Sequence, residues 1–344
     1  ASILNVKYVN SSALHRIEQE FERNGVNISR QTMSNWIMRC SEKYFAPFVE
    51  RMKEELLSLH VTQSDETPTQ VIKDSDHPNS KCYMWVHRSG EFYEDRPIVI
   101  YEYQKGRDHK SPLEFYKDYS GILVTDSLQQ YHLIEKKLPN VTNANCWAHA
   151  RRSFADAVKI ADKKDPKSVK QSVAYQALQK IGELKMLSSQ ERLQKRQEFI
   201  KPLVEEFFAW VKEQIEQCSV PPKSKTGEGL QFIINQEKYL RVFLEDGDVP
   251  IDNSASERAI RTFCLGKKNW MFHNTANGAA ASALVYSISE TAKLNNLRPY
   301  YYFKYILTEL PNFCDEQGNI DSTKLDDLMP WSDKLPEECR KPRR

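Results

Sequence analysis

Five short runs between residues 61 and 147 limit the folds that this 344-residue chain can adopt. The first starts at Val61, and the others are Lys81–Arg88, Pro97–Tyr103, Gly121–Thr125 and Val141–Trp147. Alternating apolar residues, or β-branched and aromatic ones, predict a strand for each run. The segments between the later strands predict two helices, Ser111–Tyr119 and Leu128–Lys137. The order is three strands, a helix, and two strands around a second helix, which indicates an α/β core with a mixed sheet.

The first 58 residues are expected to be helical throughout. A first helix, from about Ser12 to Asn24, is expected to have Ser11 or Ser12 as its cap. Gly25 then supplies the left-handed residue that stops a helix. A later helix, Phe48–Leu59, leads into the strands.

Between these two helices lies another, capped by Ser29 and running to Cys40. Two short helices joined by a glycine-containing turn form a helix-turn-helix pattern. The polar face of the second helix offers Arg30 and Gln31, residue types that suit base edges or phosphates. The alternative is an ordinary helical hairpin whose polar face is solvated. The pattern alone leaves both open, and Arg30 and Gln31 are candidate DNA contacts.

Apolar residues at helical spacing also follow the last predicted strand. Val173 and Ala177 lie on one such face, and Phe207 and Val211 on another, after Pro202 at a helix start. We expect these helices to form an insertion that interrupts the core. The predicted regions are a helical region 1–58, a core 59–149, a helical insertion 150–235, a second part of the core 236–312, and a polar basic tail 313–344.

Three carboxylates lie in contexts suited to metal-dependent phosphodiester chemistry: Asp65, Asp126 and Glu257. Asp126 follows the apolar run Gly121–Thr125, and Glu257 lies one turn into a predicted helix. Two carboxylates at the ends of adjacent strands, with a third from a helix laid against them, can hold a pair of hard divalent cations. The alternative is structural: a strand-end Asp, a turn Asp and a surface Glu paired with Arg261 one turn on. Spacing alone does not decide between them.

The residues around these carboxylates resemble the insertion sequence 66 family of bacterial transposases. The matching stretches are Asp65-Glu66-Thr67-Pro68, Cys146–Arg152, Ile251–Arg261, Gly266–Trp270 and Glu290–Asn295. They occur in the family's order, and the resemblance runs from about Tyr8 to Trp331. The chain departs from the family at Thr262, where proline is usual, and at His273-Asn274-Thr275, which replace a turn of small residues.

This resemblance implies a ribonuclease H-like fold and an Asp-Asp-Glu transposase with the triad Asp65, Asp126 and Glu257. The first and fourth strands are neighbours in such a sheet, so Asp65 and Asp126 are expected to lie together. The triad is expected to bind Mg²⁺, for which Mn²⁺ can substitute. Glu66→Gln, a change beside the triad, is expected to reduce cleavage far less than a change within the triad.

The implied partners are transposon-end DNA and target DNA, further copies of the chain in a homo-oligomer on DNA, and accessory proteins of the same element. Family members usually carry an N-terminal zinc-binding region and a coiled segment. This chain begins at Ala1 without a Met, so we expect it to start within a longer protein. Two alternatives stay open: a ribonuclease H-like nuclease without strand transfer, and a domesticated, non-catalytic DNA-binding protein.

Further candidate DNA contacts are mostly basic residues. The net charge of +2 is modest for a DNA-binding protein, so local clusters matter more than the total. The candidates are His149, Arg151, Arg152, Lys223, Lys225, Arg258, Arg261, Lys267, Lys268 and Trp270. Trp270 is a candidate for stacking on an unpaired base, and a buried core Trp is an equal alternative.

Cys146 and His149 have the spacing of half a zinc site. A structural zinc site needs about four ligands, and no second Cys/His pair stands nearby, so we expect Cys146 to be a buried strand end and Trp147 a packing anchor. His149 is expected at the rim of the active site.

The seven cysteines are scattered and odd in number, which predicts reduced thiols. No apolar run reaches the roughly 18 residues of a membrane span, and we expect a cytoplasmic, nucleoid-associated bacterial protein.

Overall fold

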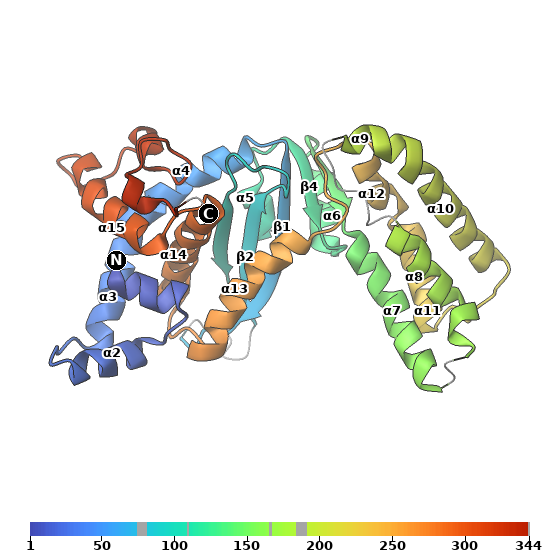
Figure 1. The fold of residues 1–344 in the computed structure, drawn as a ribbon, viewed down its shortest axis with the longest axis horizontal. Helices are drawn as coiled ribbons and strands as arrows, with labels where there is room; N and C mark the ends of the chain where they lie inside the picture. The colour runs from blue at the N-terminus through green and yellow to red at the C-terminus, as the bar shows by residue number, and fades with distance from the viewer. Residues whose placement is uncertain (74–80, 109, 165–166, 184–190, 343–344) are drawn as a thin grey trace. The chain divides into compact units, whose positions relative to one another are not determined.

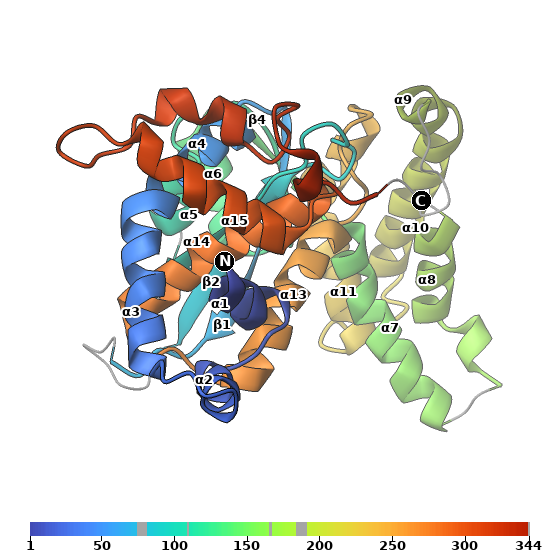
Figure 2. The same cartoon turned by 60° about the vertical axis from the view of Figure 1, so that its left-hand side comes forward.

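The computed structural model describes residues 1–73, 81–108, 110–164, 167–183 and 191–342. The chain divides into two compact units, residues 1–120 with 256–344, and residues 121–255. Figures 1 and 2 show the helices and strands of each unit. In the described ranges, no helix combines the length and the apolar character that crossing a membrane requires.

The N-terminal residues of the first unit fold into short helices, as predicted. They are α1 (Ser2–Leu4), η1 (Asn5–Val9), α2 (Leu14–Arg23), α3 (Arg30–Cys40), η2 (Ser41–Phe45) and α4 (Ala46–Leu57). Gly25 follows α2 with a φ of 75°, the left-handed conformation expected of a helix stop. Helices α2 and α3 contact one another, and α3 also packs on α14 (Ala276–Leu294).

One of the two predicted helix caps is confirmed and the other is wrong. The side chain of Ser29 accepts a hydrogen bond from the amide of Thr32 at 3.1 Å, which caps α3. Helix α2 instead begins after Ala13, which makes no side-chain cap bond. Ser11 has a φ of 59°, so it lacks the extended conformation that a capping residue needs. Ser12 lies one residue too early.

Three antiparallel strands form the sheet of the first unit. They are β1 (Val61–Thr69), β2 (Cys82–Ser89) and β3 (Val99–Gln104), and α5 (Lys110–Phe115) follows them. Asp65 on β1 lies opposite Val86 on β2. The adjacent residues Trp85 and Val86 face opposite sides of the sheet and are both fully buried. Strand β2 is therefore covered on both faces.

Helix α14 covers the edge strand β3 with hydroxyl groups. Thr291 Oγ1 accepts the N–H of Val99 at 3.0 Å and donates to the carbonyl of Val99 at 2.9 Å. Ser287 Oγ accepts the N–H of Tyr101 at 2.8 Å. These bonds satisfy strand groups that an open edge would leave exposed.

Helix α13 (Ser254–Trp270) packs closely against α14 at Gly266. A Cβ atom at Gly266 would lie 2.1 Å from Oη of Tyr286, so glycine alone permits this approach. The helices that complete this unit are α15 (Pro299–Glu309), η7 (Leu310–Phe313), η8 (Ser322–Leu328) and η9 (Glu337–Cys339). The segment predicted as a polar tail buries Leu325 and Leu328, and Tyr302 Oη donates to the carbonyl of Leu328 at 2.8 Å.

In the second unit, two parallel strands are joined by a helix. They are β4 (Gly121–Thr125) and β5 (Val141–Asn145), with α6 (Gln129–Lys137) between them. The five strands are ordered β3-β2-β1-β4-β5 in one mixed sheet, which confirms the predicted α/β class with a ribonuclease H-like core. Strand β5 ends two residues earlier than predicted, because Trp147 begins a helix.

Helices make up the rest of the second unit. They are α7 (Trp147–Lys164), η3 (Val169–Gln171), α8 (Val173–Glu183), α9 (Arg192–Lys195), η5 (Arg196–Ile200), α10 (Lys201–Glu216), α11 (Lys225–Asn235), α12 (Glu237–Arg241) and η6 (Val242–Leu244). Helices α7, α8, α10 and α11 lie side by side (Figures 1 and 2). Trp147 is fully buried, its Nε1 donates to the carbonyl of Leu240 at 2.8 Å, and its ring packs on Phe207. It is the packing anchor that the sequence predicted.

Candidate active site

Asp65 lies in the middle of β1 and is half-buried. Its Oδ1 accepts a hydrogen bond from the amide of Glu66 at 2.9 Å. A carboxylate held by its own backbone has fewer accessible orientations than a free one, so the strand fixes its direction.

The strand that carries Asp65 rests on a buried polar network. Ser64 Oγ donates to the carbonyl of Val86 at 3.1 Å and lies 2.9 Å from Nδ1 of His87. The Tyr116 hydroxyl lies 3.2 Å from the same nitrogen. Burial lowers the pKa of His87, so the imidazole is neutral and can both donate and accept in this network. Buried hydrogen bonds of this kind restrain the position of a strand.

Asp126 follows the last residue of β4 and is also half-buried. Its Oδ1 accepts from the amide of Leu128 at 3.1 Å, the bond of an Asx turn. The hydroxyl of Thr125 donates to the carbonyl of Asp126 at 2.7 Å. The turn after β4 therefore fixes this carboxylate too.

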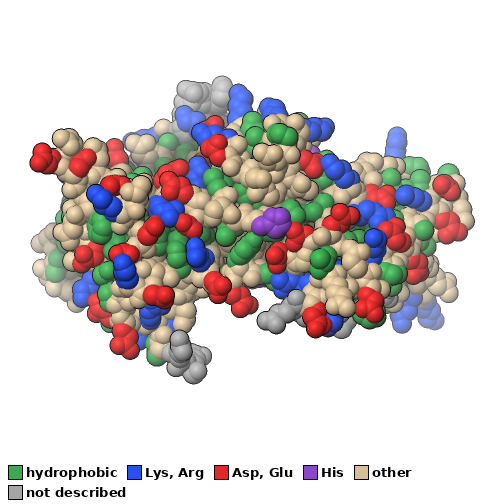
Figure 3. Space-filling view, turned by 90° about the horizontal axis from the view of Figure 1, so that it is seen from above, with side chains coloured by type: hydrophobic (Ala, Val, Ile, Leu, Met, Phe, Trp, Pro, Cys, Tyr) green, Lys and Arg blue, Asp and Glu red, His purple; other side chains and the backbone are tan. Residues whose placement is uncertain are grey.

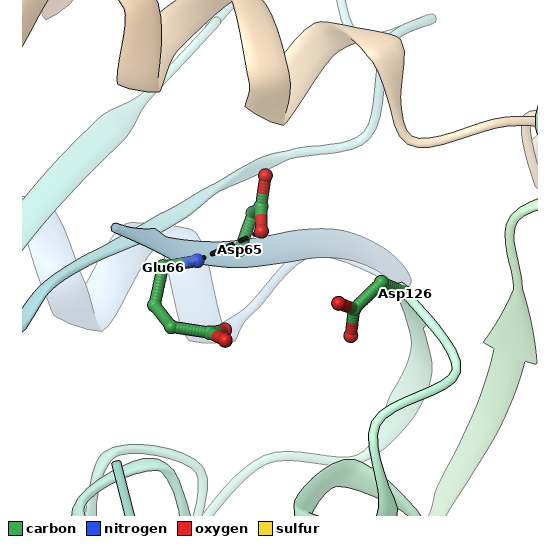
Figure 4. A group of neighbouring side chains, drawn as sticks. All are labelled: Asp65, Glu66 and Asp126. Carbon is green, nitrogen blue, oxygen red and sulfur yellow. Dashed lines mark hydrogen bonds between the residues drawn. The ribbon is translucent and has the colours of Figure 1, made fainter. Parts of the chain in front are cut away.

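Asp65, Glu66 and Asp126 form a group of three carboxylates. Each offers an oxygen atom, and these atoms all lie within 4.8 Å of one another. In Figure 4 the side chains of Asp65 and Glu66 leave β1 on opposite sides, as adjacent strand residues do. Carboxylate oxygens are the ligands that hard divalent cations such as Mg²⁺ prefer. The donor set fits such a cation.

The sequence did not predict that Glu66 belongs to this group of carboxylates. Its side chain is fully buried, and Arg107 donates to Oε1 through Nε at 2.7 Å and lies within 2.6 Å through Nη2. A fully buried carboxylate that binds a guanidinium is not a neutral position for the stability of the fold. The small effect of Glu66→Gln on cleavage stays a prediction. Alternation along β1 turns Glu66 to the side of the strand opposite Asp65, so the sequence pattern gave no signal that Glu66 belongs to this group.

Glu257 lies in the first turn of α13 and is half-buried. It is outside the group of three carboxylates, as far as the described residues show. Contacts of α13 with β1 set its direction: Cys264 Sγ lies 3.6 Å from Thr67 Oγ1, and Lys267 Nζ donates to the carbonyl of Pro68 at 2.6 Å. Residue numbers therefore rise in the same direction along the helix and the strand.

This register turns Glu257 toward the part of β1 that carries Asp65. Glu257 precedes Cys264 by about two helical turns, so both side chains lie on the same face of α13. Asp65 precedes Thr67 by two residues and shares its side of β1. Glu257 lies about 10 Å from Cys264 along the helix. Asp65 lies about 7 Å from Thr67 along the strand, so the two separations are similar. Both carboxylates therefore lie on the facing sides of α13 and β1.

The candidate DNA contacts of α3 lie on its surface. Arg30 is exposed, and its Nε lies 3.9 Å from Oε2 of Glu18. Gln31 is exposed as well and donates to Oδ1 of Asn35 at 3.0 Å. Both side chains are accessible to a ligand, and their contact with DNA stays a prediction.

The candidates of the second unit lie on α7 and at the start of α11. His149 is half-buried in the first turn of α7. Arg151 and Arg152, which follow it on the same helix, are exposed. Lys223 is exposed, and Lys225 forms an ion pair of 3.0 Å with a residue one turn along α11. Cys146 is buried after β5 and accepts an N–H from Asn253 at 3.1 Å, as expected of a strand end.

The basic candidates on α13 differ in their surroundings. Arg258 Nη2 lies 2.5 Å from Oε1 of Glu91, so its charge is already paired. Lys267 is bound to the carbonyl of Pro68, and Lys268 is exposed. On the face of the molecule drawn in Figure 3, basic and acidic side chains are intermingled. No single basic surface on that face marks where DNA binds.

The last two candidates on this helix are Arg261 and Trp270. Arg261 is exposed. Trp270 is half-buried, with its ring centroid 5.6 Å from that of Phe263 and 4.4 Å from that of His273. The indole therefore packs within an aromatic cluster, and base stacking by Trp270 stays a prediction.

All seven cysteines are free thiols, as expected.

Comparison with known protein families covers most of the chain. Residues 1–281 match the family described as "Transposase IS66 family", and residues 287–331 match the "IS66 C-terminal element". The first match contains Asp65, Asp126 and Glu257. The second covers the segment from α14 through η8.

Three proteins of Sinorhizobium fredii (strain NBRC 101917 / NGR234) are similar to the chain along nearly its whole length. Uncharacterized protein y4hP is 27% identical over 347 residues, which cover 96% of this chain and 61% of the relative. Uncharacterized protein y4qI is 28% identical, with 95% of this chain and 61% of the relative covered. For uncharacterized protein y4jD the identity is 24%, and the coverage is 96% and 65%. The chain thus spans less than two thirds of the length of these relatives.

Proposed function

The chain belongs to the IS66 family of transposases, and from this we propose that it cuts DNA at the 3′ ends of its element and joins those ends to target DNA. In the first step a water oxygen attacks phosphorus and the P–O3′ bond breaks, which leaves a 3′-hydroxyl. In the second step that hydroxyl attacks a phosphodiester of the target, and a target 3′-oxygen leaves. Both are in-line displacements that need no covalent link to the protein.

Asp65, Asp126 and Glu257 are the proposed catalytic residues and metal ligands. The observation that carries the proposal is the group of carboxylates to which Asp65 and Asp126 belong, in a chain of this family. Mg²⁺ suits these hard oxygen donors, and Mn²⁺ is the expected substitute. When bound, divalent cations in such a site stabilise negative charge on the attacking and leaving oxygens.

Each of the three residues has a separate part in this proposal. Asp65 and Asp126 would hold a cation jointly, and each is oriented by a backbone amide, of Glu66 and of Leu128. Glu257 would contribute a further carboxylate from α13. The facing sides of α13 and β1, fixed by Thr67 and Cys264, support this role for Glu257.

The proposed partners are transposon-end DNA and target DNA. We further propose that the chain acts as a homo-oligomer on DNA, with accessory proteins of the same element, in the bacterial cytoplasm at the nucleoid. Arg30, Gln31, Arg151, Arg152, Lys223, Arg261 and Lys268 are exposed, which is the property that a contact with DNA requires of them.

A cleavage and joining assay tests the function. The protein is incubated with labelled element ends, unlabelled target duplex and Mg²⁺, and the products are separated by size. Transposase activity gives nicked 3′ ends and a longer joined product. Cleavage without the joined product identifies a nuclease, and binding without cleavage identifies a non-catalytic DNA-binding protein; either result contradicts the proposal.

A further inference from the structure

A pocket of about 250 Å³ lies in the first unit, between α3, the N-terminal residues and the start of α14. Lys7, Gln31, Ser34, His273 and Thr275 are among the residues that line it. Aspartate and glutamate are absent from this lining within the described residues. The pocket is remote in sequence from the carboxylates of β1 and β4, and none of the proposed catalytic residues reaches it.

The first turn of α14 gives the pocket a positive electrostatic character. Thr275 caps the helix, and its Oγ1 accepts from the amide of Gly278 at 3.1 Å. The amides of Ala276 and Asn277 have no acceptor within the helix. The pocket itself reaches the helix start through Asn274, Thr275 and Gly278. The first turn holds no acidic residue that would offset the dipole of this long helix. Such a helix start attracts an anion.

His273 supplies a second, independent sign of a ligand. Its side chain is 8% exposed and lines the pocket, and its Nε2 is buried without a hydrogen-bond partner in the part of the chain that the structure describes. The backbone of His273 is held on both sides, because its N–H donates to Gln70 at 2.9 Å and its carbonyl accepts from Ile72 at 3.0 Å. These bonds fix the backbone from which the ring extends.

The chemistry of His273 suits a donor to an anion. Burial and the nearby charge of Lys7 lower the pKa of His273 to about 3, so the imidazole is neutral at pH 7. A neutral imidazole with its proton on Nε2 donates one N–H. That donor requires an acceptor, and buried polar atoms are almost always paired in folded proteins.

Lys7 supplies the charge. Its Nζ lies 5.0 Å from the ring centroid of Tyr8 and 5.7 Å from that of Trp270. No carboxylate forms an ion pair with Lys7 among the residues described. Burial lowers the pKa of Lys7 to about 8, so most of the ammonium remains charged at pH 7. A half-buried cation held by aromatic rings, without a carboxylate, is ready to bind an anion.

We propose that this pocket binds a phosphate group of the DNA backbone, held by Lys7 and by Nε2 of His273 beside the positive start of α14. This inference rests on the proposed function, because it takes DNA as the source of the phosphate. Gln31 and Ser34 bring the exposed face of α3 to the same pocket, so a duplex whose phosphate occupies it lies along that helix. Backbone contacts of this kind fix the position and register of a helix on DNA.

The salt dependence of DNA binding tests the role of Lys7. The full chain is titrated into a short fluorescein-labelled duplex in EDTA at several salt concentrations, and anisotropy gives the affinity. Lys7→Met keeps the apolar stem and removes the charge, so the slope of log affinity against log salt is expected to fall by about 0.9. Lys43→Met is the matched control, because Lys43 also lies over a neighbouring tyrosine ring, at 5.4 Å, but outside the pocket. An unchanged slope for Lys7→Met, or an equal fall for both variants, overturns the proposal.

A second variant separates binding from folding. Asn274 is exposed, lines the pocket and immediately precedes the cap of α14, so Asn274→Asp is nearly isosteric and its new charge favours the helix start. The melting temperature is expected to stay equal or to rise, while DNA affinity falls severalfold because the carboxylate repels the phosphate. Unchanged affinity for Asn274→Asp overturns the proposal even if Lys7→Met fails to fold.

A titration with inorganic phosphate distinguishes a pocket that binds the DNA backbone from one that binds free phosphate. If phosphate alone shifts the ring signals of His273 in NMR spectra and Lys7→Met leaves the DNA slope unchanged, the pocket binds free phosphate and the proposal is overturned. The assays in EDTA do not depend on cleavage. A chain that binds DNA through Lys7 but cuts nothing with Mg²⁺ contradicts the proposed function and leaves this inference standing.

Discussion

Arg107 donates from Nε to Oε1 of Glu66 at 2.7 Å, and the side chain of Glu66 is fully buried while that of Arg107 is 40% exposed. The pair places a guanidinium against a carboxylate of the group that includes Asp65 and Asp126. Arg107 therefore offsets part of the negative charge that these residues bring together. Glu66 is better suited to hold Arg107 than to serve as a freely available ligand.

Glu66→Gln is expected to lower the free energy of unfolding by about 1–3 kcal/mol, because a charged hydrogen bond to a buried group is lost. Urea unfolding of the variant measures this loss. Glu20→Gln is the control, since Glu20 forms a 2.6 Å pair with Arg23 on the exposed surface. That change is expected to leave the free energy of unfolding nearly unchanged, because exposed ion pairs contribute little. Equal losses for the two variants would show that burial of Glu66 contributes nothing.

Asp65→Asn, Asp126→Asn and Glu257→Gln are each expected to abolish Mg²⁺-dependent cleavage almost as fully as all three changes together. Each substitution removes a negative ligand from a hard cation, and residues that act as a unit give non-additive losses. Cleavage rates are measured on labelled element ends, and circular dichroism checks the fold.

Glu290→Gln tests the assignment of the third carboxylate. Glu290 lies on α14, where it is buried and forms a 2.6 Å ion pair with Lys293. This variant is expected to retain cleavage. Loss of cleavage in Glu290→Gln, together with normal cleavage in Glu257→Gln, would show that the role assigned to Glu257 is wrong.

The stability of the fold is expected to decrease in acid through His273. Its pKa is about 3 in the folded chain and about 6.5 when unfolded, so the unfolded chain binds the proton more readily. The stability that the neutral ring contributes is complete above pH 6.5 and is lost as the pH falls toward 3. The slope is at most about 1.4 kcal/mol per pH unit for this one group.

Urea unfolding between pH 7 and pH 4 measures this dependence. His273→Gln is expected to flatten the curve relative to the unchanged chain, because the variant takes up no proton at this position. His15→Gln, a change of an exposed histidine, is the control. Parallel curves for His273→Gln and the unchanged chain would contradict the prediction.

Gly266→Ala is expected to destabilise the fold by about 1–3 kcal/mol, although alanine favours a helix over glycine by about 1 kcal/mol. The added Cβ would lie 2.1 Å from Oη of Tyr286, so steric overlap outweighs the helix preference. Tyr286→Phe removes that oxygen, and the double variant is expected to recover most of the loss. Thermal unfolding of the two single variants and the double variant measures this coupling; additive effects would contradict it.

Features set by neighbouring residues could be predicted from the sequence. The Ser29 cap, the Gly25 helix stop and the bounds of β4 depend on a few adjacent residues, and the structure has them where expected. The cap at Ser11 or Ser12 failed because the backbone there adopts a left-handed conformation that the residue types do not reveal.

Features set by distant residues could not be predicted in this way. The partner of Glu66 lies 41 positions away, and the contact of Thr67 with Cys264 spans 197 positions. Neither distance follows from periodicity or spacing. The resemblance indicated which carboxylates to consider, but the burial of Glu66 and the direction of α13 along β1 required the folded chain.

The hydroxyls of Thr291 and Ser287 have a consequence for how copies of this protein can assemble. They already occupy the backbone groups of Val99 and Tyr101 on β3. These backbone groups of β3 are therefore not available to a strand from a neighbouring molecule, which cannot extend the sheet by pairing with them. Any assembly on this side has to form through the outer surfaces of helices, so its subunits can separate without unravelling the sheet that carries Asp65.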